Sequence, residues 1–318
     1  MMENCKITVA GIGAVGGLIA SMLGRKYEEK ITLIARGKNA ENLREKGLIF
    51  KSEFYGDSIM HPVAVVECGD ELPVQDFVFI CCKNYSIDQI CEQVRPCIGP
   101  NTIVMPVMNG VEPGDRIREK FPDAICIDSL IYTITSKEPD YSVKQSGKYT
   151  HIFIGSKPRD ERHIEASKKV YELFKSVGFD ARYTDDIMSE VWQKFILNCG
   201  FNVMTSRYQT TSGKIRENEE WCNDLAELMK EAEVVGRAEG VNIPEGTAKV
   251  KYDYCMEKQP YDATSSMRRD VDAKRPTELD AFLGAVIRKA DKLGIDVPYA
   301  RKYHRELSEI INSYGGNI

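Results

Sequence analysis

The sequence predicts an α/β protein in which an N-terminal Rossmann-type, doubly wound parallel sheet is followed by a C-terminal all-helical domain. Three observations carry this prediction: a glycine-rich turn between an apolar strand and a helix, further apolar runs separated by helical segments, and the loss of strand patterns after residue 185. Runs that are apolar throughout indicate strands buried on both faces, which is typical of parallel sheets. We therefore expect a dinucleotide-binding domain at 1–185 and a helical substrate domain at 186–318.

The elements of the first half follow from apolar runs, helical periodicity and turn residues. Strands are expected at 6–10, 31–35, 77–82, 102–108 and 181–184, with helical patterns at 18–25, 86–94, 112–120 and 161–177. The segment 124–155 predicts further strands with a turn at Gly147. These elements alternate along the chain as they do in a doubly wound sheet.

The second half has only helical patterns. Helices are expected at 187–206, 219–240, 244–258 and 277–293, the last followed by the terminators Gly294 and Pro298. The segment 259–275 is the most polar connection between helices. It has the composition of a binding loop, although a merely solvated loop is the alternative.

Gly11, Gly13 and Gly16 have the spacing of a dinucleotide-binding turn. The first glycine permits a tight turn, the second lets a pyrophosphate approach the backbone, and the third allows close packing of helix on strand. The N-terminus of the following helix favours anions. A turn that merely needs glycines is the alternative, but the strand, turn and helix context favours cofactor binding by Gly11, Ile12, Gly13, Ala14, Val15 and Gly16.

The end of the second strand decides which dinucleotide is expected. About 20 residues beyond the glycines, NAD-binding proteins normally carry an acid that binds the adenosine ribose. This chain has Arg36 there, with Lys38 just after it. A cation attracts the additional 2′-phosphate of NADP, whereas a carboxylate repels it. Arg36 could be a plain surface residue, but we interpret it as a ligand of NADP, which is the expected cofactor.

Lys194, Asn198 and Asn202 recur at intervals of four residues in an otherwise apolar helical segment. They therefore share one face of the helix. A polar stripe is usually a solvated face, but asparagine is a poor helix former and its neighbours are apolar, which favours a stripe that lines a cleft. An ammonium in a cleft can give a proton to an oxygen that gains negative charge, as ketone reduction requires.

A second polar cluster lies at 265–270 and 275–280. Thr277 or Pro276 together with Glu278 is typical of a helix start, so capping is one interpretation. Serine hydroxyls such as that of Ser266 can also hold a substrate carboxylate. Spacing alone does not decide between these two interpretations.

Composition argues against several classes of protein. The net charge of −5 leaves no basic surplus for nucleic acid or an anionic membrane, and no apolar stretch approaches the roughly 18 residues of a membrane span. The first residues run directly into a strand rather than a signal peptide, so we expect a cytoplasmic protein.

Metal and disulfide chemistry are not expected either. His61, His151, His163 and His304 lack ligand spacing, and the ten cysteines include no C-x-x-C. The cysteines are interpreted as buried, reduced thiols.

Several short motifs follow one another in a characteristic order. They are Gly11-Ile12-Gly13-Ala14-Val15-Gly16-Gly17, Ala35-Arg36-Gly37, Cys82-Lys83, Asn109-Gly110, Trp192-x-Lys194-x-x-x-Asn198, Ser265-Ser266-Met267-x-x-Asp270, and Arg275-Pro276-Thr277-Glu278-Leu279-Asp280 followed by Gly284. In their joint order and spacing, the chain resembles the ketopantoate reductase family over almost its whole length.

The resemblance implies NADP-dependent reduction of ketopantoate (2-dehydropantoate) to pantoate, in the route to pantothenate and coenzyme A, with hydride delivered to C2. It assigns Lys194 as the proton donor. Substrate binding is assigned to Asn109, Asn198, Asn202 and Ser266, and cofactor binding beyond the glycine turn and Arg36 to Lys83, Asn109 and Glu278. A homodimer is compatible with the resemblance.

Two alternatives remain at this point. One is a reductase or dehydrogenase of the same family that acts on another small 2-oxo or 2-hydroxy acid. The other is a non-catalytic NADP-binding sensor, which ranks lower because Lys194 and Ser266 are both present. The turn 111–114 departs from the more glycine-rich or amide-bearing turn of many members, so the backbone near the nicotinamide is not predicted by the resemblance.

Overall fold

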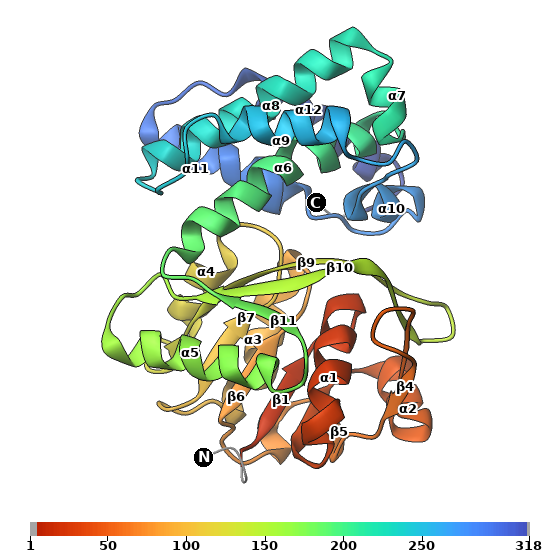
Figure 1. Cartoon of the computed structure of the whole chain (residues 1–318), viewed down its shortest axis with the longest axis vertical. Coiled ribbons are helices and arrows are strands. Elements are labelled where there is room, and N and C mark those ends of the chain that lie inside the picture. Colours follow the sequence, from red (N-terminus) through yellow and green to blue (C-terminus); the bar gives the residue numbers. More distant parts are fainter. Residues whose placement is uncertain (1–4, 317–318) are drawn as a thin grey trace. The chain divides into compact units, whose positions relative to one another are not determined.

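The computed structural model describes residues 5–316 and divides the chain into two compact units (Figure 1). The first unit comprises the described residues up to Asn109 together with Pro113–Ile187. The second comprises Gly110–Glu112 and the described residues from Met188 onward. The short segment after Asn109 therefore groups with the helices rather than with the sheet that precedes it.

The first unit is built on a six-stranded sheet in which every neighbouring pair is parallel. The strand order is β5 (Ala64–Val66), β2 (Ile31–Ile34), β1 (Ile7–Ala10), β6 (Phe77–Ile80), β7 (Ile103–Pro106) and β8 (Ile125–Cys126). The order turns back at β1, which is the topological switch point of a Rossmann-type sheet. The predicted parallel α/β fold is confirmed.

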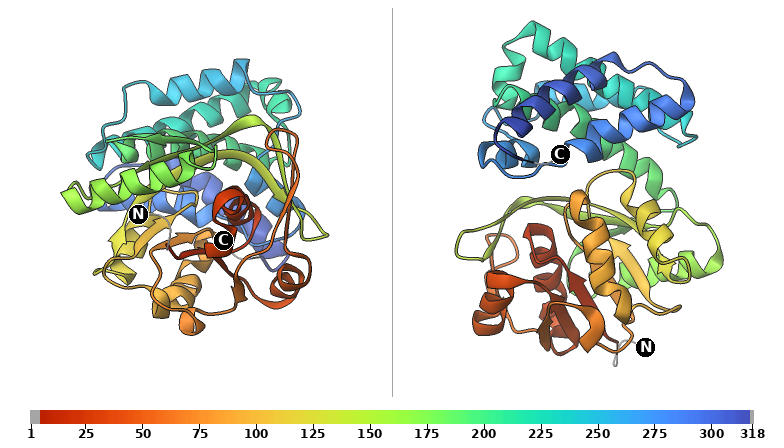
Figure 2. Two further views of the ribbon diagram at one scale, coloured as in Figure 1. Left: turned by 60° about the horizontal axis from the view of Figure 1, so that its bottom comes forward. Right: turned by 180° about the vertical axis from the view of Figure 1, so that it is seen from behind.

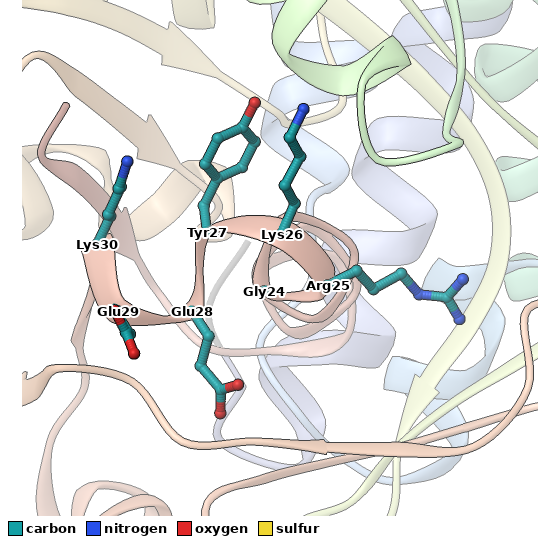
Figure 3. Close-up of a pocket in the computed structure, with 7 residues that line it drawn as sticks. All are labelled: Gly24, Arg25, Lys26, Tyr27, Glu28, Glu29 and Lys30. Atoms are coloured by element: carbon teal, nitrogen blue, oxygen red, sulfur yellow. The ribbon is translucent and has the colours of Figure 1, made fainter. Parts of the chain in front are cut away.

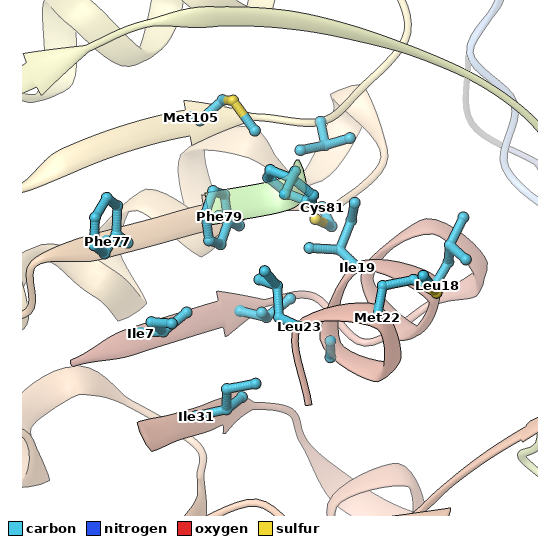
Figure 4. Packing of buried hydrophobic residues seen from close by; sticks show 14 of the residues in the cluster. Ile7, Leu18, Ile19, Met22, Leu23, Ile31, Phe77, Phe79, Cys81 and Met105 are labelled. Carbon is cyan, nitrogen blue, oxygen red and sulfur yellow. The ribbon is translucent and has the colours of Figure 1, made fainter. Parts of the chain in front are cut away.

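Each face of this sheet carries its own apolar core. On one face, α1 (Ala14–Tyr27) and α5 (Glu161–Lys175) cover alternate strand residues, including Ile7 and Phe79, as Figure 4 shows for α1. On the other face, α3 (Ile87–Val94) and α4 (Pro113–Lys120) cover Val78 and its neighbours. Burial on both faces explains why the strands are apolar throughout.

A second sheet packs on the α1 side. Its order is β11 (Asp180–Tyr183), β10 (Val143–Gly155), β3 (Leu48–Ser52) and β4 (Ser58–Met60), and β9 (Asp128–Lys137) pairs antiparallel with β10. A Cβ on Gly17 of α1 would stand 2.4 Å from Val143 Cγ2, so only glycine allows this close approach.

The predicted turn at Gly147 is wrong. Gly147 lies inside β10, in an irregular stretch between Ser146 and His151 where the pairing with β9 shifts register. The turn between the two strands lies at 138–142 instead. The sequence could not separate the two cases because a glycine with positive φ, here +74°, suits a bulge as well as a turn.

Several short or unexpected elements escaped the sequence analysis. They are α2 (Gly37–Lys46), β3, β4, β5, α7 (Ser212–Arg216), α10 (Ser266–Asp272) and α12 (Pro298–Ser313). The expected connection at 259–275 thus contains a short helix. Pro298 begins a helix instead of marking the end of one, because proline fits the first helical turn, where its missing N–H is not needed.

The second unit contains only helices among its described residues (Figure 2). The main ones are α6 (Ile187–Arg207), α8 (Glu219–Ala238), α9 (Thr247–Glu257), α11 (Ala285–Leu293) and α12, and a π-helical turn, η5 (Asp280–Gly284), leads into α11. Two buried carboxylates of α8 fix neighbouring helix starts: Glu231 accepts from the backbone of Tyr299 and Ala300, and Glu233 from that of Gly246 and Ala248.

The described residues contain no disulfide and no candidate membrane-spanning helix. All ten cysteines are free thiols, and seven of them are buried. Within the described part of the chain, none of the helices combines the length and the apolar character needed to cross a bilayer.

Candidate cofactor and substrate sites

The glycine turn joins β1 to α1 in a tight conformation. Gly11 has φ +89°, its N–H donates to the Ile34 carbonyl at 3.1 Å, and the Gly13 N–H donates to the Gly11 carbonyl at 2.9 Å. Gly13 caps the N-terminus of α1, where no side chain accepts a hydrogen bond from the first turn. The N–H groups of this helix start are therefore available to an anion.

The three glycines meet different surroundings. A Cβ on Gly16 would stand 2.1 Å from the Gly11 carbonyl oxygen, and one on Gly11 would stand 3.0 Å from the Cys81 carbonyl oxygen. A Cβ on Gly13 would meet no heavy atom within 4 Å. Gly11 and Gly16 are thus required by packing, whereas the open space at Gly13 fits a pyrophosphate that approaches the backbone.

Arg36 lies beyond the end of β2, at the N-terminus of α2. Its guanidinium is exposed and donates to the Gln89 side chain of α3 at 2.9 Å. Three residues further on, Asn39 donates from Nδ2 to the Ile12 carbonyl in the glycine turn at 3.0 Å. Sequence analysis missed both Gln89 and Asn39, because neither belongs to a local motif.

Lys137 reaches the same place from the end of β9. Its Nζ donates to the Ile12 carbonyl at 3.1 Å and to Asn39 Oδ1 at 2.5 Å. Burial lowers the pKa of this ammonium to about 8. Lys137 is separated from the glycine turn by more than 100 residues, and no spacing in the sequence indicates the contact.

Lys83 and Asn109 follow the ends of the neighbouring strands β6 and β7. Because all strands of the sheet are parallel, both residues lie at the same edge as the glycine turn. The buried Asn84 donates from Nδ2 to the Asn109 carbonyl at 2.9 Å and so joins the two strand ends. Asn84 is a further residue that sequence analysis did not single out.

The polar stripe of the second unit lies on α6. Lys194 and Asn198 are half-buried, whereas Asn202 is buried. Asn202 Nδ2 donates to Asn198 Oδ1 at 3.1 Å. Burial lowers the pKa of Lys194 to about 8, against the opposing effect of the Glu278 carboxylate, which favours the ammonium.

Asn202 also connects α6 to α10. Its Oδ1 accepts from the Ser266 hydroxyl at 3.3 Å and from the Met267 N–H at 3.4 Å. Ser265 is the residue that caps α10, since its hydroxyl accepts from the Arg268 N–H. Ser266 is the first residue of the helix, so its hydroxyl is not the cap.

The predicted site residues thus form two groups, one in each unit. In the first unit, the glycine turn, Arg36, Lys83 and Asn109 lie at the carboxyl edge of the parallel sheet. In the second, contacts and charge bring together Lys194, Asn198, Asn202, Ser266 and Glu278. The first group lies where such sheets bind dinucleotides, and the second combines an ammonium with carboxylate, hydroxyl and amide groups.

A separate hollow of about 260 Å³ lies at the C-terminal end of α1, and Figure 3 shows its lining by the consecutive residues 24–30. The glycine turn stands at the opposite end of this 14-residue helix, roughly 20 Å away at 1.5 Å per residue. Between residues 5 and 316, no group of three His, Cys, Asp or Glu side chains could hold a metal ion.

Comparison with known proteins gives two matches to family models. The model described as Ketopantoate reductase PanE/ApbA matches residues 7–159, and the one described as Ketopantoate reductase PanE/ApbA C terminal matches residues 186–310. A 2-dehydropantoate 2-reductase of Mesorhizobium japonicum is 28% identical over 88% of this chain and 90% of its own length.

Solved structures resemble the whole chain. The 2-dehydropantoate 2-reductase of Methylococcus capsulatus aligns with a TM-score of 0.86 at 23% identity over 98% of both chains. A D-mandelate dehydrogenase, solved in a ternary structure with NADH and anilino(oxo)acetate, aligns with a TM-score of 0.86 at 21% identity. The alignment covers 98% of this chain and 100% of the dehydrogenase. A dimeric ketopantoate reductase of Staphylococcus aureus aligns with a TM-score of 0.80 at 21% identity, over 98% of this chain and 100% of its own. These identities show a shared fold.

Proposed function

Because the chain belongs to the ketopantoate reductase family and is therefore an oxidoreductase, we propose that it reduces 2-dehydropantoate to pantoate with NADPH. The reaction would supply pantoate for pantothenate and coenzyme A. The observation that carries the proposal is Lys194, an ammonium on α6 with a pKa of about 8, grouped with the amides and hydroxyl that a 2-oxo acid needs.

The glycine turn, Arg36, Lys83 and Asn109 would hold the dinucleotide, and the open space at Gly13 fits its pyrophosphate. When bound, the reduced nicotinamide supplies a hydride to C2 of the 2-oxo acid. Glu278 would contact cofactor or substrate from the helical unit. Arg36, as a cation in place of the usual acid, favours NADP over NAD.

Lys194 would donate a proton from Nζ to the ketone oxygen as that oxygen gains negative charge. With a pKa of about 8, roughly nine-tenths of the side chain is ammonium at pH 7, yet it releases a proton far more readily than an ordinary lysine. The Glu278 carboxylate keeps the donor charged between turnovers because its negative charge favours the ammonium.

Asn198 and Ser266 would orient the substrate, the hydroxyl of Ser266 by turning its one O–H from Asn202 Oδ1 to the substrate carboxylate. Asn202 would position both groups, since its Nδ2 donates to Asn198 and its Oδ1 accepts from the Met267 N–H next to Ser266. Loss of the Asn202 amide would therefore act on the substrate through its neighbours.

A second candidate is the reduction of another 2-oxo acid. The mandelate dehydrogenase neighbour favours it, because the same fold there accompanies a different 2-hydroxy acid.

A homodimer also belongs to the proposal, supported by the dimeric relative from Staphylococcus aureus. Light scattering after gel filtration should measure a mass twice that of the 35.9 kDa chain.

The test is NADPH oxidation by the purified protein against ketopantoate, 2-oxoisovalerate, pyruvate and phenylglyoxylate, with NADH in parallel. We expect selective turnover of ketopantoate with NADPH. Selective turnover of another acid would replace the substrate and keep the reaction class. Tight NADPH binding with no turnover of any acid would refute the catalytic proposal in favour of a sensor.

The role of Lys194 is tested by Lys194→Ala, with Lys230→Ala on the exposed side of α8 as the matched control. Loss of a general acid should lower kcat by about 10²- to 10⁴-fold and leave the NADPH dissociation constant within about threefold. The control should retain full turnover. A Lys194→Ala variant with near-normal kcat, or with equal losses of kcat and NADPH affinity, would contradict the assignment.

A further inference from the structure

Within the first unit, Lys137 brings a cation to the backbone of the glycine turn. It stands at the end of β9, and its Nζ donates to the Ile12 carbonyl and to Asn39 Oδ1. Asn39 in turn donates to the same Ile12 carbonyl. The ammonium therefore bridges the turn that follows β1 and the first turn of α2.

The charge of this ammonium is not balanced by an acid. Its two hydrogen-bond partners are neutral oxygens, and burial is the single cause of its lowered pKa, with no carboxylate among the described residues opposing the shift. An ammonium has three N–H donors, so these two bonds leave one for a further acceptor. A half-buried cation surrounded by neutral groups is a costly arrangement unless an anion completes it.

A structural role alone explains the arrangement poorly. An amide such as glutamine could bridge two carbonyl oxygens without the cost of removing a charge from water. The ring of Tyr141, 5.2 Å from Nζ, adds only a weak attraction to the positive charge. A cation therefore costs more than a neutral amide would as a means of holding the turn, and its position next to the proposed dinucleotide site suits a phosphate as the acceptor of its third N–H.

The residues around Lys137 indicate which phosphate group of the dinucleotide it would contact. Asn39 belongs to the helical turn that Arg36 begins, and the first turn of α2 contains no acid. This is the place where the group on the adenosine ribose is recognised in such folds. Lys137 approaches it from the second sheet, a direction that neither Arg36 nor Lys38 shares.

We propose that Lys137 donates to the 2′-phosphate of NADP and is a specificity-determining residue for NADP over NAD. This inference rests on the proposed function in that it requires a nicotinamide dinucleotide at the glycine turn. It does not depend on the identity of the 2-oxo acid.

The test measures binding rather than turnover. Dissociation constants are determined by titration calorimetry for adenosine 2′,5′-bisphosphate, adenosine 5′-monophosphate, NADPH and NADH. The variants are Lys137→Gln, which keeps N–H donors without charge, and Lys137→Arg, which keeps the charge. Lys148→Gln, which removes an exposed cation from β10, is the matched control.

We expect Lys137→Gln to raise the dissociation constants of the bisphosphate and of NADPH by about 10- to 100-fold, because one hydrogen bond to a charged group is lost. The dissociation constants of AMP and NADH should change by less than about threefold. Lys137→Arg should restore most of the loss, and Lys148→Gln should match the wild type. Thermal unfolding without ligand checks that each variant is folded.

Lys137→Gln would overturn the inference if it lost as much affinity for AMP as for the bisphosphate and as much for NADH as for NADPH. Such a result would place Lys137 at the pyrophosphate or in support of the turn. An unchanged NADPH constant in Lys137→Gln would overturn it as well. Both results leave the proposed function intact. If the wild-type protein binds neither NADPH nor NADH, the proposed function fails and this inference falls with it.

Discussion

Replacing Gly13 by alanine tests whether the glycine turn binds a ligand or merely needs glycines for its backbone conformation. In the structure, Gly13 has an extended backbone, with φ −95° and ψ −153°, which an alanine can adopt. A Cβ there meets no heavy atom within 4 Å. The substitution should therefore weaken the binding of a ligand that approaches the backbone and hardly change the stability of the protein without ligand.

The expected change in stability is the sum of two small opposing effects. Alanine reduces the conformational entropy of the unfolded chain, which stabilises by about 0.4–1 kcal/mol. It is also a poorer N-cap than glycine, which costs about 0.5 kcal/mol. The net change lies within about 0.5 kcal/mol of zero, so Tm should move by less than about 2 °C.

The expected change in affinity is much larger. The added methyl group prevents the close approach of the pyrophosphate to the backbone N–H groups of the turn. Losing one hydrogen bond to a charged group costs about 1.5–3 kcal/mol, which corresponds to about 10- to 150-fold in the NADPH dissociation constant.

Gly16→Ala is the contrasting variant, because its Cβ would stand 2.1 Å from the Gly11 carbonyl oxygen. That overlap with backbone should cost up to about 3 kcal/mol, against a gain of about 1 kcal/mol in helix propensity. We expect a clear fall in Tm for Gly16→Ala only. Thermal unfolding and NADPH titration measure both effects. A fall of more than about 4 °C for Gly13→Ala, or unchanged NADPH binding, would refute the separation of roles.

Two further predictions concern the helical unit. The kcat/KM for ketone reduction should be level below pH 8 and fall about tenfold per pH unit above it, because only the ammonium of Lys194, with its pKa of about 8, can donate a proton. Glu278→Gln should move this break to lower pH, since the Glu278 carboxylate favours the ammonium; a pH profile without a break between pH 7 and 9.5 would rule out Lys194 as the donor. Asn202→Ala should destabilise the protein by about 1–3 kcal/mol in urea unfolding, because the Ser266 hydroxyl and the Met267 N–H lose their shared acceptor. Asn312→Ala, at an exposed position of α12, is the control, and equal stability of the two variants would contradict this account.

Elements with a strong local pattern could be predicted from the sequence. Four strands of the parallel sheet are buried on both faces, the helices α5 and α8 have clear periodicity, and α6 is a long, mostly apolar segment, so residue order alone indicates them. The glycine turn was equally visible from the spacing of its three glycines between a strand and a helix, although one reason for Gly11 is the Cys81 carbonyl, 70 residues further along the chain.

Elements without such a pattern could not be predicted. Strands of three residues, such as β4 and β5, are too short for any periodicity to show. The second sheet is held by pairing of β10 with β3, about 90 residues earlier in the chain, and local propensity carries no information about that pairing.

By itself, the sequence determined the parallel sheet, the place of the glycine turn and the shared helix face of Lys194, Asn198 and Asn202, because the pattern that indicates each lies within one strand, turn or helix. Only the tertiary structure decided that Asn84 joins two strand ends, that Asn202 holds α10, and that Lys137 contacts the glycine turn. These contacts join residues separated by 25 to more than 100 positions. Their partners are chosen by the packing of whole elements, which no local spacing records.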